Sequence, residues 1–254
     1  MANVDLVQLE MKQNTARITL NRPEKRNALS PALITALQES LRRLNEETQV
    51  SMIVLAGAGK DFCAGMDIST LEKGSQADAI DHMNTARHLA ELLLAIRRHR
   101  CPVIAAVHGR ALGGGAGIAA ACDLVLAAES AEFGYPEVNI GFVPAMVAAF
   151  VRRNVAEKRM FELLVFGAPV KAAEALAMGL INRVFPDASF AEGAEAYVQN
   201  LAKKSATALS LTKRLLYHTD GMTLEQAVEA GVQVNALSRT TGDAKKGFAG
   251  FVKK

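Results

Sequence analysis

Residues 103–121 read VIAAVHGRALGGGAGIAAA, and this stretch decides the fold. Its first five residues are apolar and predict a buried strand over 103–107. Three glycines at 113–115 follow, and the small residues after them predict a short, closely packed helix over 116–121. A glycine at the N-terminus of a helix leaves its N–H group free to point at an anion, and the helix dipole strengthens the attraction. The stretch therefore predicts a strand, a glycine turn and a buried helix that begins with an anion-binding backbone.

Two different interpretations of the glycine run stay open. Residues 115–120 loosely match a dinucleotide-binding fingerprint that ends in alanine. In a true fingerprint the helix opens directly after the strand, whereas residues 108–112 intervene here. The glycines also fit a purely structural role, in which they only let a buried helix pack closely. The anion-binding interpretation is the one we favour, and it needs a second backbone donor nearby.

The chain before this stretch predicts a hairpin, a polar loop, an amphipathic helix and a buried strand. Ser30 is a good N-cap, Pro31 suits the first helical position, and leucines then recur at helical spacing. The predicted ranges are 4–11 and 15–20 for the hairpin with a turn near 13–14, 21–27 for the loop, 31–46 for the helix and 51–56 for the strand.

The chain after this stretch predicts one more buried strand and then mostly helices. After Pro186 no strand candidate remains and at least three helices are expected. We therefore place a boundary near residue 187, between an α/β part over 1–187 and an all-helical part over 188–254. The remaining predicted ranges are 67–81 as a polar, mobile stretch, 83–98 as a helix, 123–128 as a strand, 133–141 as a strand or loop, 144–153, 156–166 and 172–178 as helices, and 181–185 as a short strand.

The composition predicts a globular protein that keeps its cysteines reduced. Of 254 residues, half are apolar and 22% are charged. The three cysteines are an odd number without metal-ligand spacing, which favours a reducing, cytoplasmic compartment. We expect no signal peptide and no membrane span, because no apolar run reaches about 18 residues. The net charge of +3 comes from scattered basic residues, which argues against nucleic acid but allows a local patch for a phosphorylated ligand.

Several common catalytic signatures are missing from the sequence. It has no Gly-x-Ser-x-Gly elbow, no phosphate-binding loop that ends in Gly-Lys-Ser/Thr, and no His-Glu-x-x-His. The five histidines are dispersed. We therefore expect neither a metal site nor a Ser-His triad.

A second loop complements the glycine run. Residues 62–67 read FCAGMD and follow the predicted strand 51–56. Alone they form a turn that Asp67 caps. Together with the glycine run they supply two backbone N–H groups from separate loops, and two donors aimed at one oxygen are what a thioester enolate requires. The sequence thus predicts a backbone oxyanion hole.

One carboxylate stands out as an acid/base candidate. Glu137 lies in FGYPE, residues 133–137, with apolar residues on both sides. Partial loss of hydration raises the pKa of a carboxyl group and suits it to proton transfer. An ion-paired structural glutamate is the competing interpretation. For Asp123, which enters a strand, we favour a structural role in which its side chain caps a neighbouring turn.

Several segments taken together resemble the crotonase family, also called the enoyl-CoA hydratase/isomerase family. The resemblance covers nearly the whole chain in order. It implies a spiral of strand-strand-helix units followed by a helical domain used for trimer assembly, often as a hexamer of two trimers. The segments are LNRPEKRNAL at 20–29, residues 62–67, 102–115, 121–123 and 133–144, EALAMGLI at 174–181, and GFAGF at 247–251.

The resemblance also assigns the site. It implies an acyl-CoA thioester as substrate, with no cofactor beyond the coenzyme A of that substrate. The oxyanion donors would be the N–H groups of Met66 and Gly114, with Glu137 as acid/base. Lys25 and Arg26 would face the phosphates of coenzyme A, and the backbone near Ala64 its adenine. The remaining expected substrate contacts are Ala28, Asp67, Ile68, Gly113, Tyr135 and Ala145, with Phe248 and Phe251 on the far side of the pocket or from a neighbouring subunit.

One position departs from the family pattern. Hydratases of the family commonly carry a second glutamate at the position of Gly117. Addition of water needs one group to activate the water and one to deliver a proton, whereas moving a double bond from C3 to C2 needs a single base. Glu137 alone therefore favours isomerisation, while hydration stays open if Tyr135 or a distant carboxylate assists. The same fold also supports hydrolysis, decarboxylation and ring cleavage, so these reactions stay open, as do a thioester-binding protein with little activity and, as a minor hypothesis, RNA binding.

Overall fold

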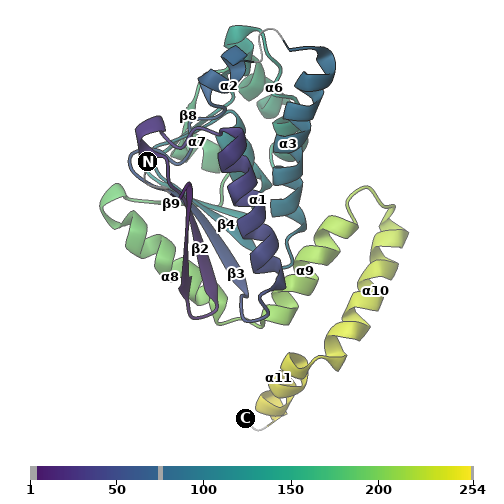
Figure 1. Cartoon of the computed structure of the whole chain (residues 1–254). Coiled ribbons are helices and arrows are strands. Elements are labelled where there is room, and N and C mark those ends of the chain that lie inside the picture. The colour runs from purple at the N-terminus through teal and green to yellow at the C-terminus, as the bar shows by residue number, and fades with distance from the viewer. Residues whose placement is uncertain (1–4, 74–76, 253–254) are drawn as a thin grey trace.

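A computed structural model describes residues 5–73 and 77–252 of the chain (Figure 1). Its main layer is a six-stranded sheet in the order β1-β2-β3-β4-β6-β9. β1 is antiparallel to β2, and every later pair of neighbours is parallel. The strands are β1 Val7–Lys12, β2 Thr15–Leu20, β3 Met52–Gly57, β4 Val103–Val107, β6 Leu124–Ala128 and β9 Arg183–Phe185.

A second, smaller sheet makes the fold a spiral. It contains β5 Arg110–Leu112, β7 Glu132–Gly134 and β8 Val170–Lys171 in the order β5-β7-β8. Isolated bridges join Cys63 to Ala111 and Leu29 to Met66. After each of β3, β4 and β6, the chain therefore leaves the main sheet and adds an extended segment to the second one. This arrangement confirms the predicted spiral of strand-strand-helix units and brings successive loops to one edge.

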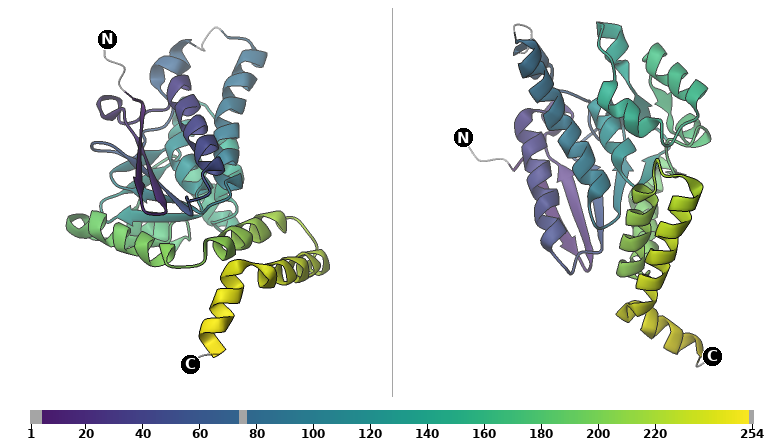
Figure 2. Two further views of the ribbon diagram at one scale, coloured as in Figure 1. Left: turned by 60° about the horizontal axis from the view of Figure 1, so that its bottom comes forward. Right: turned by 90° about the vertical axis from the view of Figure 1, so that its right-hand side faces the viewer.

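Helices cover both faces of the main sheet and continue beyond it (Figures 1 and 2). The helices of the first part are α1 Pro31–Glu46, α2 Ile68–Lys73, α3 Ala79–Arg98, α4 Gly114–Ala121, α5 Ala145–Val151, α6 Glu157–Phe166 and α7 Ala172–Ala177. The later ones are α8 Phe190–Ala202, α9 Ala206–His218, α10 Leu224–Thr240 and α11 Gly242–Val252. Short 3-10 turns are η1 Pro23–Lys25, η3 Pro136–Ile140 and η4 Asp187–Ser189.

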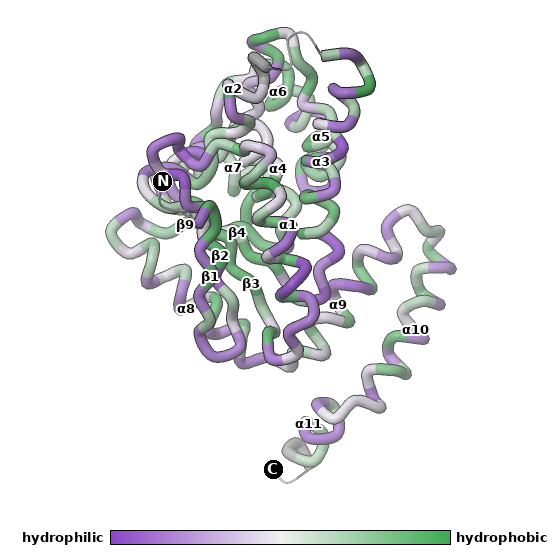
Figure 3. The backbone as a smooth tube through the Cα atoms, in the orientation of Figure 1, coloured by the Kyte–Doolittle hydropathy of each residue, from purple (hydrophilic) through white to green (hydrophobic). Residues whose placement is uncertain are grey.

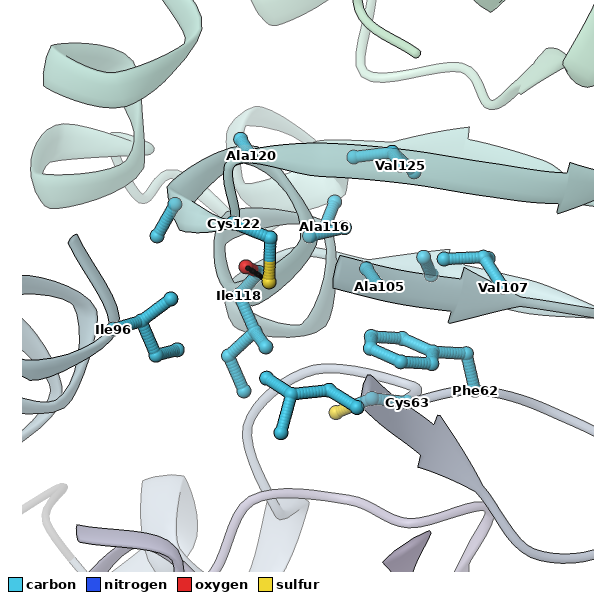
Figure 4. Close-up of a cluster of buried hydrophobic side chains, with 14 of the residues drawn as sticks. Phe62, Cys63, Ile96, Ala105, Val107, Ala116, Ile118, Ala120, Cys122 and Val125 are labelled. Carbon is cyan, nitrogen blue, oxygen red and sulfur yellow. Dashed lines mark hydrogen bonds between the residues drawn. The ribbon is translucent and has the colours of Figure 1, made fainter. Parts of the chain in front are cut away.

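The core lies on both sides of β3, which explains why that strand is apolar throughout. Ile53 and Leu55 belong to the large cluster with side chains of α1, α3 and α4. Met52 and Val54 face the other way and pack against Ala194 of α8. The central strands are accordingly hydrophobic along their length in Figure 3, and Figure 4 shows part of the large cluster, in which small residues of α4 sit against β4 and β6.

The first helix forms as the sequence predicts. Ser30 caps α1, since its hydroxyl accepts a hydrogen bond from the N–H of Leu33 at 3.2 Å, and Pro31 is the first helical residue. Leu33, Leu37, Leu41 and Leu44 are all buried. The predicted range 31–46 is confirmed.

The described residues of the segment 67–81 are mostly helical. It contains α2, and α3 begins at Ala79 rather than at residue 83 because Asp78 caps it, accepting from the N–H groups of Ile80 and Asp81 at 2.8 and 2.9 Å. Residues 74–76 lie outside the described part. The strands β5 and β8 were not predicted, and the region 133–141 contains both a strand, β7, and the turn η3.

The last helices divide into a packed pair and an arm. α8 lies against the main sheet, and α9 is tied to it by the buried pair of Lys213 and Asp123, with Nζ 2.7 Å from Oδ2. Asp123 also accepts hydrogen bonds from the N–H of Val103, at 2.6 Å, and from the hydroxyl of Tyr217, so it joins β4 to α9 instead of capping a turn. α10 and α11 project from the body (Figure 2), and none of the residues of α10 is buried.

Candidate active site

The first candidate oxyanion donor is the N–H group of Met66, and an extended bridge aims it. The N–H of Leu29 donates to the carbonyl of Gly65 at 2.7 Å, and the N–H of Asp67 donates to the carbonyl of Leu29 at 3.0 Å. In a parallel bridge the residue between these two bonds directs its own N–H and C=O away from the partner. The N–H of Met66 therefore points away from Leu29, and within the described residues it has no backbone acceptor.

The second candidate donor is the N–H group of Gly114, the first residue of α4. The first four N–H groups of a helix have no acceptor inside the helix. The preceding Gly113 donates to the carbonyl of Gly134 at 2.8 Å, which anchors the start of α4 to β7. Its φ of +51° is a left-handed conformation that favours glycine. The turn therefore fixes the direction in which the N–H of Gly114 points.

Glycines let the two loops approach each other closely. Gly65 has a φ of +95°, and a Cβ there would lie 3.0 Å from the carbonyl oxygen of Leu112. A Cβ on Gly115 would lie 2.3 Å from the carbonyl oxygen of Cys63, closer than real Cβ atoms come to such an atom. The structure thus brings the two predicted loops together and places both candidate donors beside one another.

Glu137 reaches this junction from η3. Its Oε1 lies 3.2 Å from the position that a Cβ on Gly113 would occupy, next to the candidate donor Gly114. Its Oε2 is buried and has no hydrogen-bond partner within the described part of the chain. Burial raises the pKa of Glu137 above its ordinary value. A half-buried carboxylate without an ion pair is suited to taking and returning a proton.

Tyr135 lies beneath the same junction. It is completely buried, and its hydroxyl donates a long hydrogen bond of 3.5 Å to the carbonyl of Ala116. Burial is the main cause that raises its pKa, and the nearby charge of Glu137 adds to it. Tyr135 therefore stays protonated, and its hydroxyl serves as a hydrogen-bond donor.

The loop that is expected to bind coenzyme A borders the first donor. The carbonyl of Arg26 accepts a hydrogen bond from the N–H of Ala64 at 3.0 Å. The side chains of Lys25 and Arg26 are exposed, so both can meet phosphate groups, although Nε of Arg26 also lies 3.8 Å from the buried carboxylate of Asp61. Arg26 has a φ of +49° and Asn27 one of +55°. The buried amide of Asn27 holds this shape by donating to the carbonyls of Ala58 and Asp61 at 2.9 and 2.8 Å.

The sequence of the whole chain matches one family. The sequence model described as enoyl-CoA hydratase/isomerase matches residues 10–254. The chain belongs to the enoyl-CoA hydratase/isomerase family. It is thus an enzyme of the hydratase/isomerase type, and membership of this family implies an acyl-CoA substrate.

Relatives and solved structures of the family agree over nearly the full length. A protein of Thermus thermophilus whose name includes enoyl-CoA hydratase is 41% identical, over 98% of both chains. The 2,3-dehydroadipyl-CoA hydratase of Escherichia coli is 31% identical, over 96% of this chain and 94% of its own. The crystal structure of an enoyl-CoA hydratase of Mycobacterium smegmatis superposes with a TM-score of 0.94 at 32% identity, covering 98% of this chain and 96% of the other. The fold is therefore that of the family.

The position at which hydratases of the family commonly have a second glutamate is closed in this chain. Gly117 lies in α4, one turn after Gly113. A Cβ on Gly117 would come 2.3 Å from Cγ1 of Val147 and 3.8 Å from Cδ1 of Leu93. Where the sequence has glycine in place of the family's second glutamate, the structure thus has Val147 in the space that a longer side chain would need.

The remaining expected site residues lie at different distances from the junction. Asp67 follows the donor Met66, but its side chain accepts hydrogen bonds from Ser69 and pairs with Arg22 at 3.0 Å. Ile68 and Ala145 are exposed at the starts of α2 and α5. Phe248 is exposed on α11, at the end of the projecting arm (Figure 1), and the side chain of Phe251 lies outside the described part.

Two residues of the site were missed from the sequence. The guanidinium of Arg22 donates to the carbonyl of Ala28 at 2.6 Å as well as to Asp67. These two contacts, the Arg22 clasp, join the loop at 20–29, which is expected to bind coenzyme A, to the loop at 62–67, which carries the candidate donor Met66. Val147 closes the space at Gly117. Arg22 stands in the quoted motif at 20–29, which is a signal that could have singled it out, whereas the single apolar residue Val147 carries no such signal.

Two absences hold for the described part of the chain. In residues 5–73 and 77–252, no three side chains of histidine, cysteine, aspartate or glutamate are grouped as metal ligands would be. Over the same residues, every helix is too short or too polar to cross a membrane.

Proposed function

We propose that this enzyme converts 3-enoyl-CoA thioesters into 2-enoyl-CoA thioesters, with Glu137 as its single acid/base. The N–H groups of Met66 and Gly114 would bind the thioester oxygen. The observation that carries the proposal is the contrast between two neighbouring positions: a carboxylate lies beside Gly113, while the place of a side chain on Gly117 is filled by Val147.

The reaction needs one proton to move between two carbons. The carboxylate of Glu137 takes a proton from C2 of the 3-enoyl thioester. The electrons of that C–H bond form a C1–C2 double bond, and the electron pair of the carbonyl moves onto the thioester oxygen. The two N–H groups stabilise this dienolate. Glu137 then returns the proton to C4, where the C3–C4 π pair forms the new C–H bond. The C1–C2 pair becomes the C2–C3 double bond, and a lone pair of the thioester oxygen re-forms the carbonyl.

Hydration makes a larger demand on the site. A group must take a proton from water as its oxygen bonds to C3, and a proton must reach C2. A lone carboxylate performs both tasks only in a concerted step. The apolar contact of Gly117 with Val147 leaves Glu137 without the second carboxylate of the family pattern, and this supports isomerisation.

Hydration remains the second candidate because of the names of the relatives. The Thermus thermophilus and Escherichia coli proteins both have hydratase in their names, and they match nearly the whole chain. If this enzyme hydrates 2-enoyl-CoA, the hydroxyl of Tyr135, whose pKa responds to the charge of Glu137, is a candidate for assisting it.

We propose that coenzyme A lies along the loop after β2 and the loop after β3. Exposed Lys25 and Arg26 would meet its phosphates, and the backbone at Ala28 and Ala64 its adenine end. Asp67 and Ile68, which follow Met66 in the chain, would border the same ligand. The proposed reaction uses no group beyond the thioester of the substrate itself.

We also propose that the helical part after residue 187 serves self-association into a trimer or a dimer of trimers. Leu224, Val228 and Val232 recur every four residues on α10 and are exposed, which is the pattern of an apolar helix face that awaits a partner. In such an assembly Phe248 and Phe251 would reach the pocket of a neighbouring subunit. Ala145, which is exposed, would contact the acyl group from within the subunit, whereas Tyr135 is completely buried and offers it no surface.

The assay follows the absorbance of the conjugated thioester. With a 3-enoyl-CoA the absorbance is expected to rise, and Glu137→Gln should abolish the rise, since general acid–base catalysis contributes about 10²–10⁴-fold. Glu162→Gln is the matched control, because Glu162 is an exposed residue of α6 that pairs only with Arg159 within the described residues.

The same assay with a 2-enoyl-CoA separates the candidates. Loss of absorbance there, with formation of a 3-hydroxyacyl-CoA, would favour hydration over isomerisation. No change with either substrate would contradict both activities for simple acyl chains, and an active Glu137→Gln variant would show that the base is another residue.

A further inference from the structure

The contact between α4 and α5 has no spare room at Gly117. An ideal Cβ on Gly117 would lie 2.3 Å from Cγ1 and 3.2 Å from Cβ of Val147. Both values are for side-chain atoms close to the backbone of α5, so the obstacle is not the flexible end of a long side chain. Any residue larger than glycine at position 117 therefore requires α5 or Val147 to move.

A side chain at position 117 would point toward the proposed base Glu137. Residues four apart on a helix lie on one face, and every Cα–Cβ bond tilts toward the helix N-terminus. A side chain on Gly117 would therefore lean back over Gly113, whose carbonyl accepts the N–H of Gly117 at 2.9 Å. Gly113 is also the residue beside which Oε1 of Glu137 lies. The root of that side chain is where Val147 now stands.

Val147 is poorly able to give way. It is 2% exposed and lies inside α5, and Leu93 of α3 borders the same spot. A valine in a helix has one strongly preferred side-chain conformation, because the branch at Cβ crowds the preceding turn. Close packing on all sides means that a shift of its methyl group must displace other core atoms.

We propose that Val147 is a specificity-determining residue, which selects double-bond migration by occupying the space of a second carboxylate and of the water that it would hold. The proposal rests on the proposed function, in which Glu137 alone moves the proton. A side chain on Gly117 would lean over Gly113, beside which Glu137 lies, and Val147 places a methyl group at the root of that side chain. A dienolate formed there is reprotonated at C4, and the resulting 2-enoyl thioester meets no activated water at C3.

The steric part of the proposal is tested without any substrate. Gly117→Ala should lower the midpoint temperature of unfolding, Tm, by about 2–12 °C, the range for overpacking in a core of this size. In a Val147→Ala background the same substitution should have little effect. Gly242→Ala is the control, since Gly242 is also helical and has no atom within 4 Å of a Cβ. A Gly117→Ala variant with an unchanged or raised Tm, like the control, would overturn the proposal.

The chemical part is tested by building the second carboxylate. The pair Gly117→Glu with Val147→Ala is expected to form 3-hydroxyacyl-CoA from 2-enoyl-CoA at least about tenfold faster than the unaltered enzyme, a modest part of the roughly 10²–10⁴-fold that general acid–base catalysis contributes. In that step one carboxylate takes a proton from water, the water oxygen bonds to C3, and the other carboxyl group protonates C2. Val147→Ala alone supplies room without an acid and should gain no hydration.

The outcomes separate this proposal from the proposed function. Equal hydration by Gly117→Glu with Val147 left in place would overturn the role of Val147. A folded double variant that binds coenzyme A thioesters but gains no hydration would do the same. Hydration by the unaltered enzyme would instead contradict the proposed function, and the thermal measurements would still decide whether Val147 blocks position 117.

Discussion

Replacing Arg22 by methionine tests how Met66, the proposed oxyanion donor, is held. The guanidinium of Arg22 donates to the carbonyl of Ala28 at 2.6 Å and pairs with Asp67 at 3.0 Å. Ala28 precedes Leu29, and Asp67 follows Met66, so the clasp lies outside the bridge that aims the N–H of Met66. Methionine keeps an unbranched apolar stem, though a shorter one, and removes the guanidinium group with its charge and hydrogen bonds.

The structure sets the expected loss of stability. The side chains of Arg22 and Asp67 are 15% and 12% exposed, so the pair is close to buried. Breaking a buried pair costs about 3–5 kcal/mol, and a hydrogen bond to a charged group is worth about 1.5–3 kcal/mol. Asp67 keeps two hydrogen bonds from Ser69, which places the expected loss at the lower end, about 2–3 kcal/mol. At about 2–4 °C per kcal/mol for a chain of this size, Tm should fall by roughly 4–12 °C.

The same change should reduce catalysis more than binding. Removing one oxyanion donor outright costs about 10²–10³-fold in kcat. Arg22→Met leaves the N–H of Met66 in place but loosens its aim, so we expect kcat for isomerisation to fall about 10–100-fold with a smaller change in KM. The measurement is steady-state kinetics at a temperature at which the variant is fully folded.

Arg42→Met is the matched control. Arg42 makes two ion pairs, with Glu39 and Glu46, but on the exposed face of α1, where such pairs contribute about 0–1 kcal/mol. It should change neither Tm by more than a few degrees nor kcat. An Arg22→Met variant with unaltered Tm and kcat would refute the clasp, and an unaltered kcat with a lowered Tm would refute its role in positioning Met66.

Two further predictions concern the buried charges. Lys213→Met removes one partner of the buried pair with Asp123 and should lower the free energy of unfolding, measured with denaturant, by about 3–5 kcal/mol. Lys12→Met, at the exposed pair with Glu195, should lower it by less than about 1 kcal/mol. Equal losses in the two variants would contradict the expected effect of burial. Because Glu137 must be ionised to act as a base and burial raises its pKa, kcat/KM should fall on the acid side at a pH above the ordinary 4.5 of a glutamate, and a profile still flat at that pH would contradict the role of Glu137.

The elements that the sequence predicted well are those with a local cause. α1 begins at a serine cap and a proline, and its leucines repeat at helical spacing, so both its ends were predicted correctly. β3 and β4 are apolar throughout because each is buried on both faces. The three-residue β5 and two-residue β8 have no periodicity of their own and form only because the spiral brings β7 between them. Their position could not be read from the chain alone.

The candidate site likewise contains residues that the local sequence indicates and contacts that only the fold creates. The two glycine loops and Glu137, an isolated carboxylate among apolar residues, could be singled out from the residues themselves. The choice of Met66 and Gly114 as donors came from the family resemblance, and the roles of all three residues stay predictions. Their proximity depends on Gly65 and Gly113, whose left-handed backbone permits the close turns. Arg22 was missed as a clasp because its partner Asp67 lies 45 residues away in sequence. Only the folded chain brings these two charges together.

Three glycines at the start of α4, at positions 113, 115 and 117, each leave room for a different neighbour. A Cβ on Gly113 would meet the carboxylate of Glu137, one on Gly115 the carbonyl of Cys63, and one on Gly117 a methyl group of Val147. Gly113 thus makes room for Glu137, the proposed acid/base, and Gly115 lets the loop at 62–67 approach α4. The third leaves room for a core side chain from another helix. If a glutamate had been replaced at position 117 with no other change, a cavity would remain there. Here Val147 of α5 packs into that space. Introducing a second acid at position 117 therefore requires changing Val147 as well.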